Sequence, residues 1–114
     1  MNNMPELMCA SDVIITKAGP GTITEALICG LPLVLNAYVP CQEEGNIPYV
    51  TENGVGVFVS KPIEAAEVIK DWFAGGQKKL QSISVKAKAL GTPHALFDIV
   101  RDLSTFLRPC LACA

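Results

Sequence analysis

Histidine is nearly absent from this sequence of 114 residues, which contains only His94. A metal centre built from histidines is therefore not expected, because such centres combine several ligands of this kind. Basic residues are few and scattered: the nine lysines and arginines include one adjacent pair, Lys78–Lys79, and the formal net charge is −2. Because no basic stripe is present, the sequence does not indicate a nucleic-acid partner.

A long, unbroken apolar run is also missing. No residue between Glu25 and Glu43 is charged, but Gly30, Pro32 and Pro40 interrupt this stretch, which falls short of the ~20 apolar residues that a membrane span needs. The first residues show neither the basic nor the apolar region of a signal peptide, so we expect no targeting segment here. Half of the residues are hydrophobic and 18% are charged, which is typical of one globular domain or part of one.

The five cysteines are an odd number. Cys9, Cys29 and Cys41 lie in or beside expected helices and strands, where small buried thiols are common. This distribution favours a reducing compartment. Cys110 and Cys113 have the spacing of a redox or zinc pair, but no second pair accompanies them, so we assign them no function.

Three short runs, 13–16, 33–35 and 55–59, have the composition of buried strands. They do not alternate polar with apolar residues, which is typical of strands covered on both faces. A helical segment separates each run from the next, so we predict an α/β fold with parallel β-α-β units. Because nucleotide-binding sheets of this kind usually have about five or six strands, we expect a partial domain over 4–107, incomplete at its N-terminal side, and an unstructured tail over 108–114.

Helical patterns fill the remaining intervals. Pro5 begins a short first helix, the second helix covers 23–29, and the third covers 47–53 with Asn46 as its cap. Three further helices follow from apolar residues at helical spacing. Their inward faces are expected to be Ile63, Ala66, Ile69 and Phe73; Leu80, Ile83, Ala87 and Leu90; and Leu96, Ile99, Val100, Leu103 and Leu107.

The run Gly19-Pro20-Gly21-Thr22 connects the first strand to a helix. Such a turn favours a pyrophosphate, because backbone N–H groups and the positive end of the helix dipole meet there and glycine allows close approach. Lys17 adds a cation, the Thr22 hydroxyl can donate to a phosphate oxygen, and Glu25 can accept both hydroxyls of a ribose. The alternative is structural: Thr22 caps the helix and Glu25 completes a capping box.

A second polar loop follows the strand over 33–35. Parallel strands end at the same sheet edge, where ligands of α/β proteins bind, so Gln42 and Glu43 are expected beside the glycine turn. There they could meet the hydroxyl groups of a sugar. The alternatives are a solvated acidic loop for these two residues and a simple helix cap for Asn46.

The sequence resembles the donor-binding signature of nucleotide-sugar glycosyltransferases with two Rossmann domains, the GT-B type. The matching segments are 19–25, 30–32, 40–46 and 54–56. A closer resemblance, over residues 4–107, is to the plant monogalactosyldiacylglycerol synthases. The segments that carry it are 14–23, 45–54 and 97–100. The bacterial N-acetylglucosaminyltransferase of peptidoglycan synthesis resembles the chain more distantly.

This resemblance implies a Rossmann-like C-terminal half that holds UDP-galactose, within an enzyme that transfers galactose to diacylglycerol. It implies a chloroplast envelope location and peripheral membrane association through the complete protein. Carried over, the turn 19–22 holds the diphosphate, Glu25 the ribose, and Gln42 and Glu43 the sugar, with Lys17 and Asn46 nearby. The turn's N–H groups would stabilise departing UDP, so no metal or cofactor is expected.

The resemblance leaves two parts of such an enzyme unaccounted for. We expect the sequence to lack the N-terminal, lipid-binding domain of such an enzyme, and residues 107–114 do not resemble the family's C-terminus. We assign no catalytic residue in this chain, because His94 lies far along it from the polar loop, and we expect the chain alone to be inactive. The alternative is a truncated UDP-sugar-binding module without catalysis. A dinucleotide-binding domain is disfavoured because no G-x-G-x-x-G follows the strand over 13–16.

Overall fold

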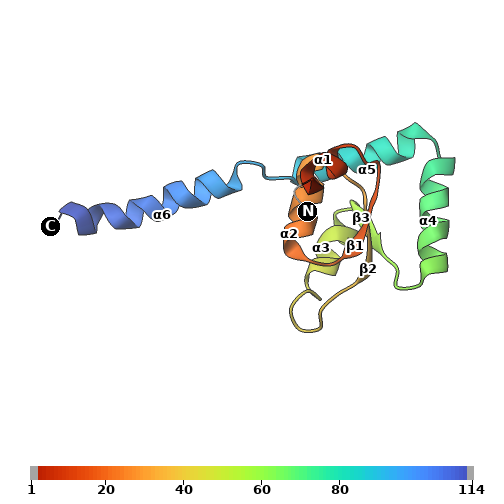
Figure 1. Cartoon of the computed structure of the whole chain (residues 1–114), viewed down its shortest axis with the longest axis horizontal. Coiled ribbons are helices and arrows are strands. Elements are labelled where there is room, and N and C mark those ends of the chain that lie inside the picture. Colours follow the sequence, from red (N-terminus) through yellow and green to blue (C-terminus); the bar gives the residue numbers. More distant parts are fainter. Residues whose placement is uncertain (1–2, 113–114) are drawn as a thin grey trace.

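The structure is a computed structural model that describes residues 3–112, with side chains described for residues 3–107. Strands and helices alternate in the first half and helices fill the second (Figure 1). In chain order they are α1 (Met4–Cys9), β1 (Ile14–Lys17), α2 (Pro20–Cys29), β2 (Leu33–Ala37), α3 (Asn46–Glu52), β3 (Gly56–Phe58), α4 (Pro62–Ala74), α5 (Gln77–Leu90) and α6 (Ala95–Ala112). The predicted α/β fold is confirmed.

The three strands form one parallel sheet in the order β1-β2-β3. Ile15 pairs with Val34, which in turn pairs with Val57. The β1–β2 and β2–β3 connections each contain a helix, as parallel neighbours require. The sequence therefore predicted the parallel direction of the strands correctly.

Both faces of the sheet are covered because the two sides of β2 are apolar. On one face, Leu33 and Leu35 are fully buried against α2 and α3, in a cluster that includes Leu27 and Val50. On the other face, Val34 is fully buried in a second cluster with residues of α4. This arrangement explains why β2 lacks polar–apolar alternation.

The face that α4 turns toward the sheet differs from the predicted one. Ala65 and Trp72 are buried, whereas Ile63 and Phe73 are 75% and 51% exposed. Residues 65, 68, 69 and 72 also have helical spacing, so the helix carries two apolar stripes. Packing on Val34 selected the stripe that places the large indole of Trp72 in the core.

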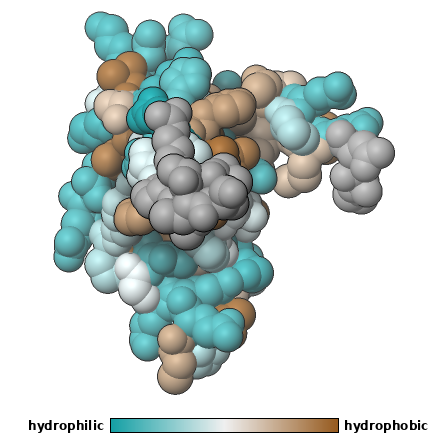
Figure 2. All heavy atoms as spheres, turned by 90° about the vertical axis from the view of Figure 1, so that its left-hand side faces the viewer, coloured by the Kyte–Doolittle hydropathy of each residue, from teal (hydrophilic) through white to brown (hydrophobic). Residues whose placement is uncertain are grey.

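α6 projects away from the rest of the molecule (Figure 1), whose longest extent is 63 Å. Its predicted inward face is open to solvent: the exposed fractions run from 55% for Ile99 to 69% for Leu96. Figure 2, viewed from the side on which α6 projects, shows hydrophobic side chains open on the surface. The prediction of a packed inward face is therefore wrong, because no described element lies against it.

α6 also continues through residues 108–112, which were predicted to be unstructured. Leu111 and Ala112 favour helix, whereas Pro109 disfavours a helix interior because it has no N–H to donate. Residue type alone therefore does not account for this last stretch of α6. Residues 113–114 lie outside the described part of the chain. Among residues 3–112, no helix combines the length and apolar character needed to cross a bilayer.

The cysteines near the sheet are less buried than predicted. Cys9 and Cys41 are exposed and Cys29 is half-buried; all three are free thiols. The sulfur atoms of Cys9 and Cys29 lie 3.7 Å apart at the ends of α1 and α2. Burial, followed by the contact with Cys9, raises the pKa of the Cys29 thiol. The predicted pair of Cys110 and Cys113 lies outside the residues whose side chains are described.

Candidate functional site

The site lies at the carboxyl edge of the sheet, where β1 and β2 end side by side. Beyond the last paired residues, the N–H of Ala18 still donates to the carbonyl of Ala37 over 2.8 Å. After this bond the chain turns into α2 on one side and into the loop 38–45 on the other. The predicted juxtaposition of the glycine turn and the polar loop is thus present.

α2 begins at Pro20, with Gly19 as its N-cap residue. The first helical hydrogen bond runs from the Ile23 N–H to the Gly19 carbonyl over 3.0 Å. Proline is favoured at the first helical position because its fixed φ suits the helix and its missing N–H costs nothing there. Thr22 therefore lies inside the first turn, and the alternative of a capping box formed by Thr22 and Glu25 is wrong.

Two N–H groups at the start of α2 lack a helical acceptor. The N–H of Gly19 already donates to the Lys17 carbonyl over 2.8 Å, and Pro20 has no N–H. The N–H groups of Gly21 and Thr22 belong to the first turn, which has no earlier carbonyl to receive them, and Gly19 has no side chain to cap them. Within the segment 19–22, the N–H groups of Gly21 and Thr22 are therefore the backbone donors that remain available to an anion.

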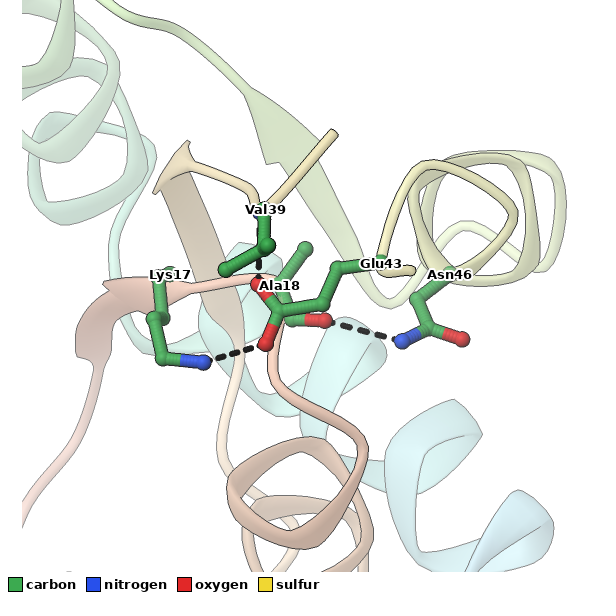
Figure 3. Close-up of polar contacts among 5 residues, drawn as sticks. All are labelled: Lys17, Ala18, Val39, Glu43 and Asn46. Atoms are coloured by element: carbon green, nitrogen blue, oxygen red, sulfur yellow. Dashed lines mark hydrogen bonds and ion pairs between the residues drawn. The ribbon is translucent and has the colours of Figure 1, made fainter. Parts of the chain in front are cut away.

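Glu43 is the buried charged residue of this edge, at 6% exposed. Figure 3 shows its carboxylate directed toward Lys17 and Val39. One carboxylate oxygen accepts from the Lys17 ammonium group, and the other accepts from the Val39 N–H over 2.9 Å. The hydrogen bond from Lys17, followed by that from Val39, lowers the pKa of Glu43, so the carboxylate is ionised at neutral pH.

Asn46 connects the same two segments a second time. Its side-chain amide donates to the Ala18 carbonyl over 2.9 Å (Figure 3). α3 begins at Asn46 itself, with Gly45 at the N-cap position and no side-chain cap. The predicted capping role of Asn46 is therefore wrong: its side chain spans the loops instead of closing its own helix.

The remaining predicted residues lie around this pair of contacts. Glu25 is exposed on α2, one turn beyond the free N–H groups, and Gln42 is exposed in the loop. Within residues 3–107, neither side chain forms a hydrogen bond to another residue, so both are available to a ligand. The alternative of a solvated acidic loop describes Gln42 and Glu44 but not the buried Glu43.

A groove of about 290 Å³ adjoins the start of α2. It lies between α2, α3 and the segment that follows α5, and its lining includes Pro20, Asn46 and Tyr49. Among the described residues, no cluster of three histidine, cysteine, aspartate or glutamate side chains could hold a metal ion.

Sequence reasoning missed the backbone groups that organise the site. The Val39 N–H donates to the Glu43 carboxylate of the loop, and the Ala18 carbonyl accepts from the Asn46 side chain at the start of α3. Every residue except proline carries such backbone groups, so residue type at positions 18 and 39 contains no signal for them. The burial of Glu43 distinguishes it from its exposed neighbours Gln42 and Glu44. The sequence pattern does not show that burial.

Comparison with known proteins places these features in a family context. The family model described as the glycosyltransferase family 28 C-terminal domain matches residues 1–61. The chain is 55% identical over 100 residues to monogalactosyldiacylglycerol synthase 3, chloroplastic, of Arabidopsis thaliana, covering 88% of this chain and 22% of that protein. It is 51% identical over 105 residues to the probable monogalactosyldiacylglycerol synthase 3, chloroplastic, of Oryza sativa subsp. japonica, covering 92% and 21%. The chain thus spans about a fifth of the length of these relatives.

A solved structure shares the fold. The glycotransferase of kitacinnamycin aligns with a TM-score of 0.56 at 20% sequence identity, covering 86% of this chain and 27% of that one. At this identity the likeness concerns the fold alone. It agrees with the predicted α/β architecture of a glycosyltransferase domain.

Proposed function

Because this chain belongs to glycosyltransferase family 28, whose C-terminal domain matches more than half of it, we propose that it binds the nucleotide-sugar donor of a galactosyltransferase. The observation that carries this proposal is the pair of free N–H groups at the start of α2, with the Lys17 ammonium beside them. Backbone N–H groups at a helix N-terminus and a nearby cation are suited to a diphosphate. Both lie at the carboxyl edge of the sheet, where α/β proteins bind ligands.

Each polar residue of this edge has a proposed role. The diphosphate lies on the turn 19–22, with Gly21 and Thr22 as N–H donors. Glu25 accepts the two ribose hydroxyls, because its carboxylate has paired acceptors. Gln42 meets the sugar, and Asn46 holds the turn in place through the Ala18 carbonyl.

The proposed donor is UDP-galactose and the proposed acceptor is diacylglycerol, in galactolipid synthesis. This proposal is supported by the names of the relatives, which are monogalactosyldiacylglycerol synthases described as chloroplastic. We accordingly propose a chloroplast location, at the envelope membrane, with peripheral membrane association through the complete enzyme. The start of α2 would stabilise the charge that develops on departing UDP.

We further propose that the general base and the acceptor site lie outside this chain, which spans about a fifth of its relatives. The chain alone then binds the donor without transferring galactose. An assay for galactolipid formed by the purified chain from UDP-galactose and diacylglycerol tests this assignment. Detectable product would contradict this assignment.

Nucleotide binding tests the proposal directly. UDP, UDP-galactose and UDP-glucose are titrated into the folded chain and followed by amide NMR shifts. We expect shifts at Gly21 and Thr22, and an affinity loss of roughly tenfold or more in Glu25→Ala, because a charged hydrogen-bond acceptor is removed. Glu67→Ala, an exposed carboxylate on α4, is the matched control and should bind normally.

The stability of Glu25→Ala separates this role from a structural one. Glu25 is exposed and makes no cap, so its removal should change the free energy of unfolding by less than about 0.5 kcal/mol. A folded chain that shows no shifts with any nucleotide would overturn the proposal.

A further inference from the structure

Glu43 has an unusual position for a residue expected to contact a sugar. Its side chain is 8% exposed, whereas its neighbours Gln42 and Glu44 are both exposed. A sugar ligand needs carboxylate lone pairs that face the open site. The carboxylate of Glu43 faces Lys17 and Val39 instead (Figure 3).

The loop itself holds Glu43 in this orientation. The Glu43 N–H donates to the Val39 carbonyl over 2.9 Å, and the Val39 N–H donates back to the Glu43 carboxylate over 2.9 Å. These reciprocal bonds close the segment 39–43 into a compact turn. The second carboxylate oxygen is thereby held toward the end of β1, where it receives Lys17.

Lys17 is held where an anion would bind. A Cβ atom placed on Gly19 would lie 3.0 Å from the Lys17 nitrogen and 3.6 Å from the Glu43 carboxylate. The ammonium group therefore lies against the turn that precedes α2. The Lys17 side chain is 56% exposed, and an ammonium has three donors, so donors remain for a ligand after the contact with Glu43.

We propose that Glu43 is a positioning residue that acts through Lys17, holding its ammonium group beside the start of α2 for the diphosphate rather than contacting the sugar. This inference rests on the proposed function. A lysine side chain loses much rotational freedom when it is held in one place, and a partner that holds it beforehand reduces that cost when the ligand binds. The contribution of Glu43 should then be the same for any ligand that carries the diphosphate.

The decisive experiment compares UDP, which has no sugar, with UDP-galactose in single and double variants. We expect Glu43→Gln to weaken both ligands equally, roughly two- to tenfold, as for loss of one pre-ordered side chain. In the Lys17→Met background, Glu43→Gln should change neither affinity further, because residues that act through one another are not additive.

Glu44→Gln is the matched control. It removes the same charge from the same loop, but Glu44 is exposed and forms no ion pair with Lys17. Loss of an exposed negative charge should leave the binding of an anion unchanged or slightly tighter. Weakening specific to Glu43→Gln would thus report the contact with Lys17 and not net charge.

Two results would overturn the inference. One is a loss of UDP-galactose affinity in Glu43→Gln while UDP binds normally, since the carboxylate would then contact the sugar. The other is an undiminished effect of Glu43→Gln in the Lys17→Met background, since Glu43 would then act without Lys17.

The pKa of Glu43, measured by ¹³C NMR in the ligand-free chain, tests the contact with Lys17 independently of nucleotide binding. It therefore distinguishes failure of this inference from failure of the proposed function. The contact lowers the pKa of Glu43, so the ion pair is present above that pKa and is lost as the pH falls through it. We expect the pKa to rise in Lys17→Met toward its ordinary value of about 4.3. If the pKa rises as expected but the chain binds no nucleotide, the contact between Glu43 and Lys17 exists and the proposed nucleotide-sugar ligand is wrong. An unchanged pKa would show that the contact itself is absent and would overturn the inference.

Discussion

α2 and α6 are two helices of one chain with opposite surroundings. α2 buries Ile23, Ala26 and Leu27 in the main core. α6 carries an equally regular apolar stripe, yet Leu103 is 58% exposed and Leu107 is 63% exposed. Periodicity shows that a helix has an apolar face, but it does not show which element covers that face.

The difference follows from the neighbours of each helix. α2 is bounded by β1 and β2, so both of its ends are attached to the sheet and its apolar face must lie on it. α6 follows α5 through a short connection, and no other described strand or helix comes after it in residues 3–112. The carboxyl edge of the sheet therefore depends on α2 and its core, and α6 is structurally separate from that edge within residues 3–112.

The largest expected effect contrasts a core leucine with a leucine of α6. Leu33→Ala should lower the free energy of unfolding by about 2–5 kcal/mol, because a fully buried side chain is replaced by a cavity. Leu103→Ala, the matched control, should change it by less than about 0.5 kcal/mol. Urea unfolding followed by circular dichroism measures both. Similar losses in the two variants would show that α6 is packed in solution.

An intermediate effect on stability is expected at Gly91, which lies in the connection to α6 and close to α2. A Cβ atom on Gly91 would lie 2.9 Å from the Leu27 carbonyl oxygen and 3.0 Å from the Cα of Ile28. Gly91→Ala should therefore destabilise the chain by about 1–3 kcal/mol, the usual range for overpacking. Gly45→Ala, where a Cβ meets nothing within 4 Å, should instead raise the melting temperature slightly, because it restricts the unfolded chain. A stable Gly91→Ala variant would mean that the connection does not rest on α2.

The smallest expected free energy is that of local opening of α6. Its amides should exchange with solvent nearly as fast as those of an isolated helix, since short helices without a packed face are marginal in water. The central amides of α2 should open only with global unfolding. Hydrogen–deuterium exchange measured residue by residue makes this comparison. Protection of α6 equal to that of α2 would contradict the separation of the two regions.

Much of the fold and part of the site could be predicted from local patterns. The runs 13–16 and 33–35 act over a few residues each, and both occur as strands within one or two residues of the predicted bounds. The predicted turn over 19–22 lies at the predicted place between strand and helix, but residues 20–22 form the first turn of α2. Helix boundaries were less secure, because the capping box of Thr22 and Glu25 and the helix beginning at Pro20 both satisfy local rules. Packing and hydrogen bonding chose between them.

Local chemistry was therefore sufficient for the order of strands and helices along the chain and for a glycine-containing connection at the carboxyl edge of a parallel sheet. It was insufficient for the partners of the polar residues there. Glu43 meets Lys17 across 26 residues and Asn46 meets Ala18 across 28, and such contacts exist only after β1 and β2 have paired. The apolar stripes of α4 and α6 show the same limit, since burial of a face depends on the element that lies against it.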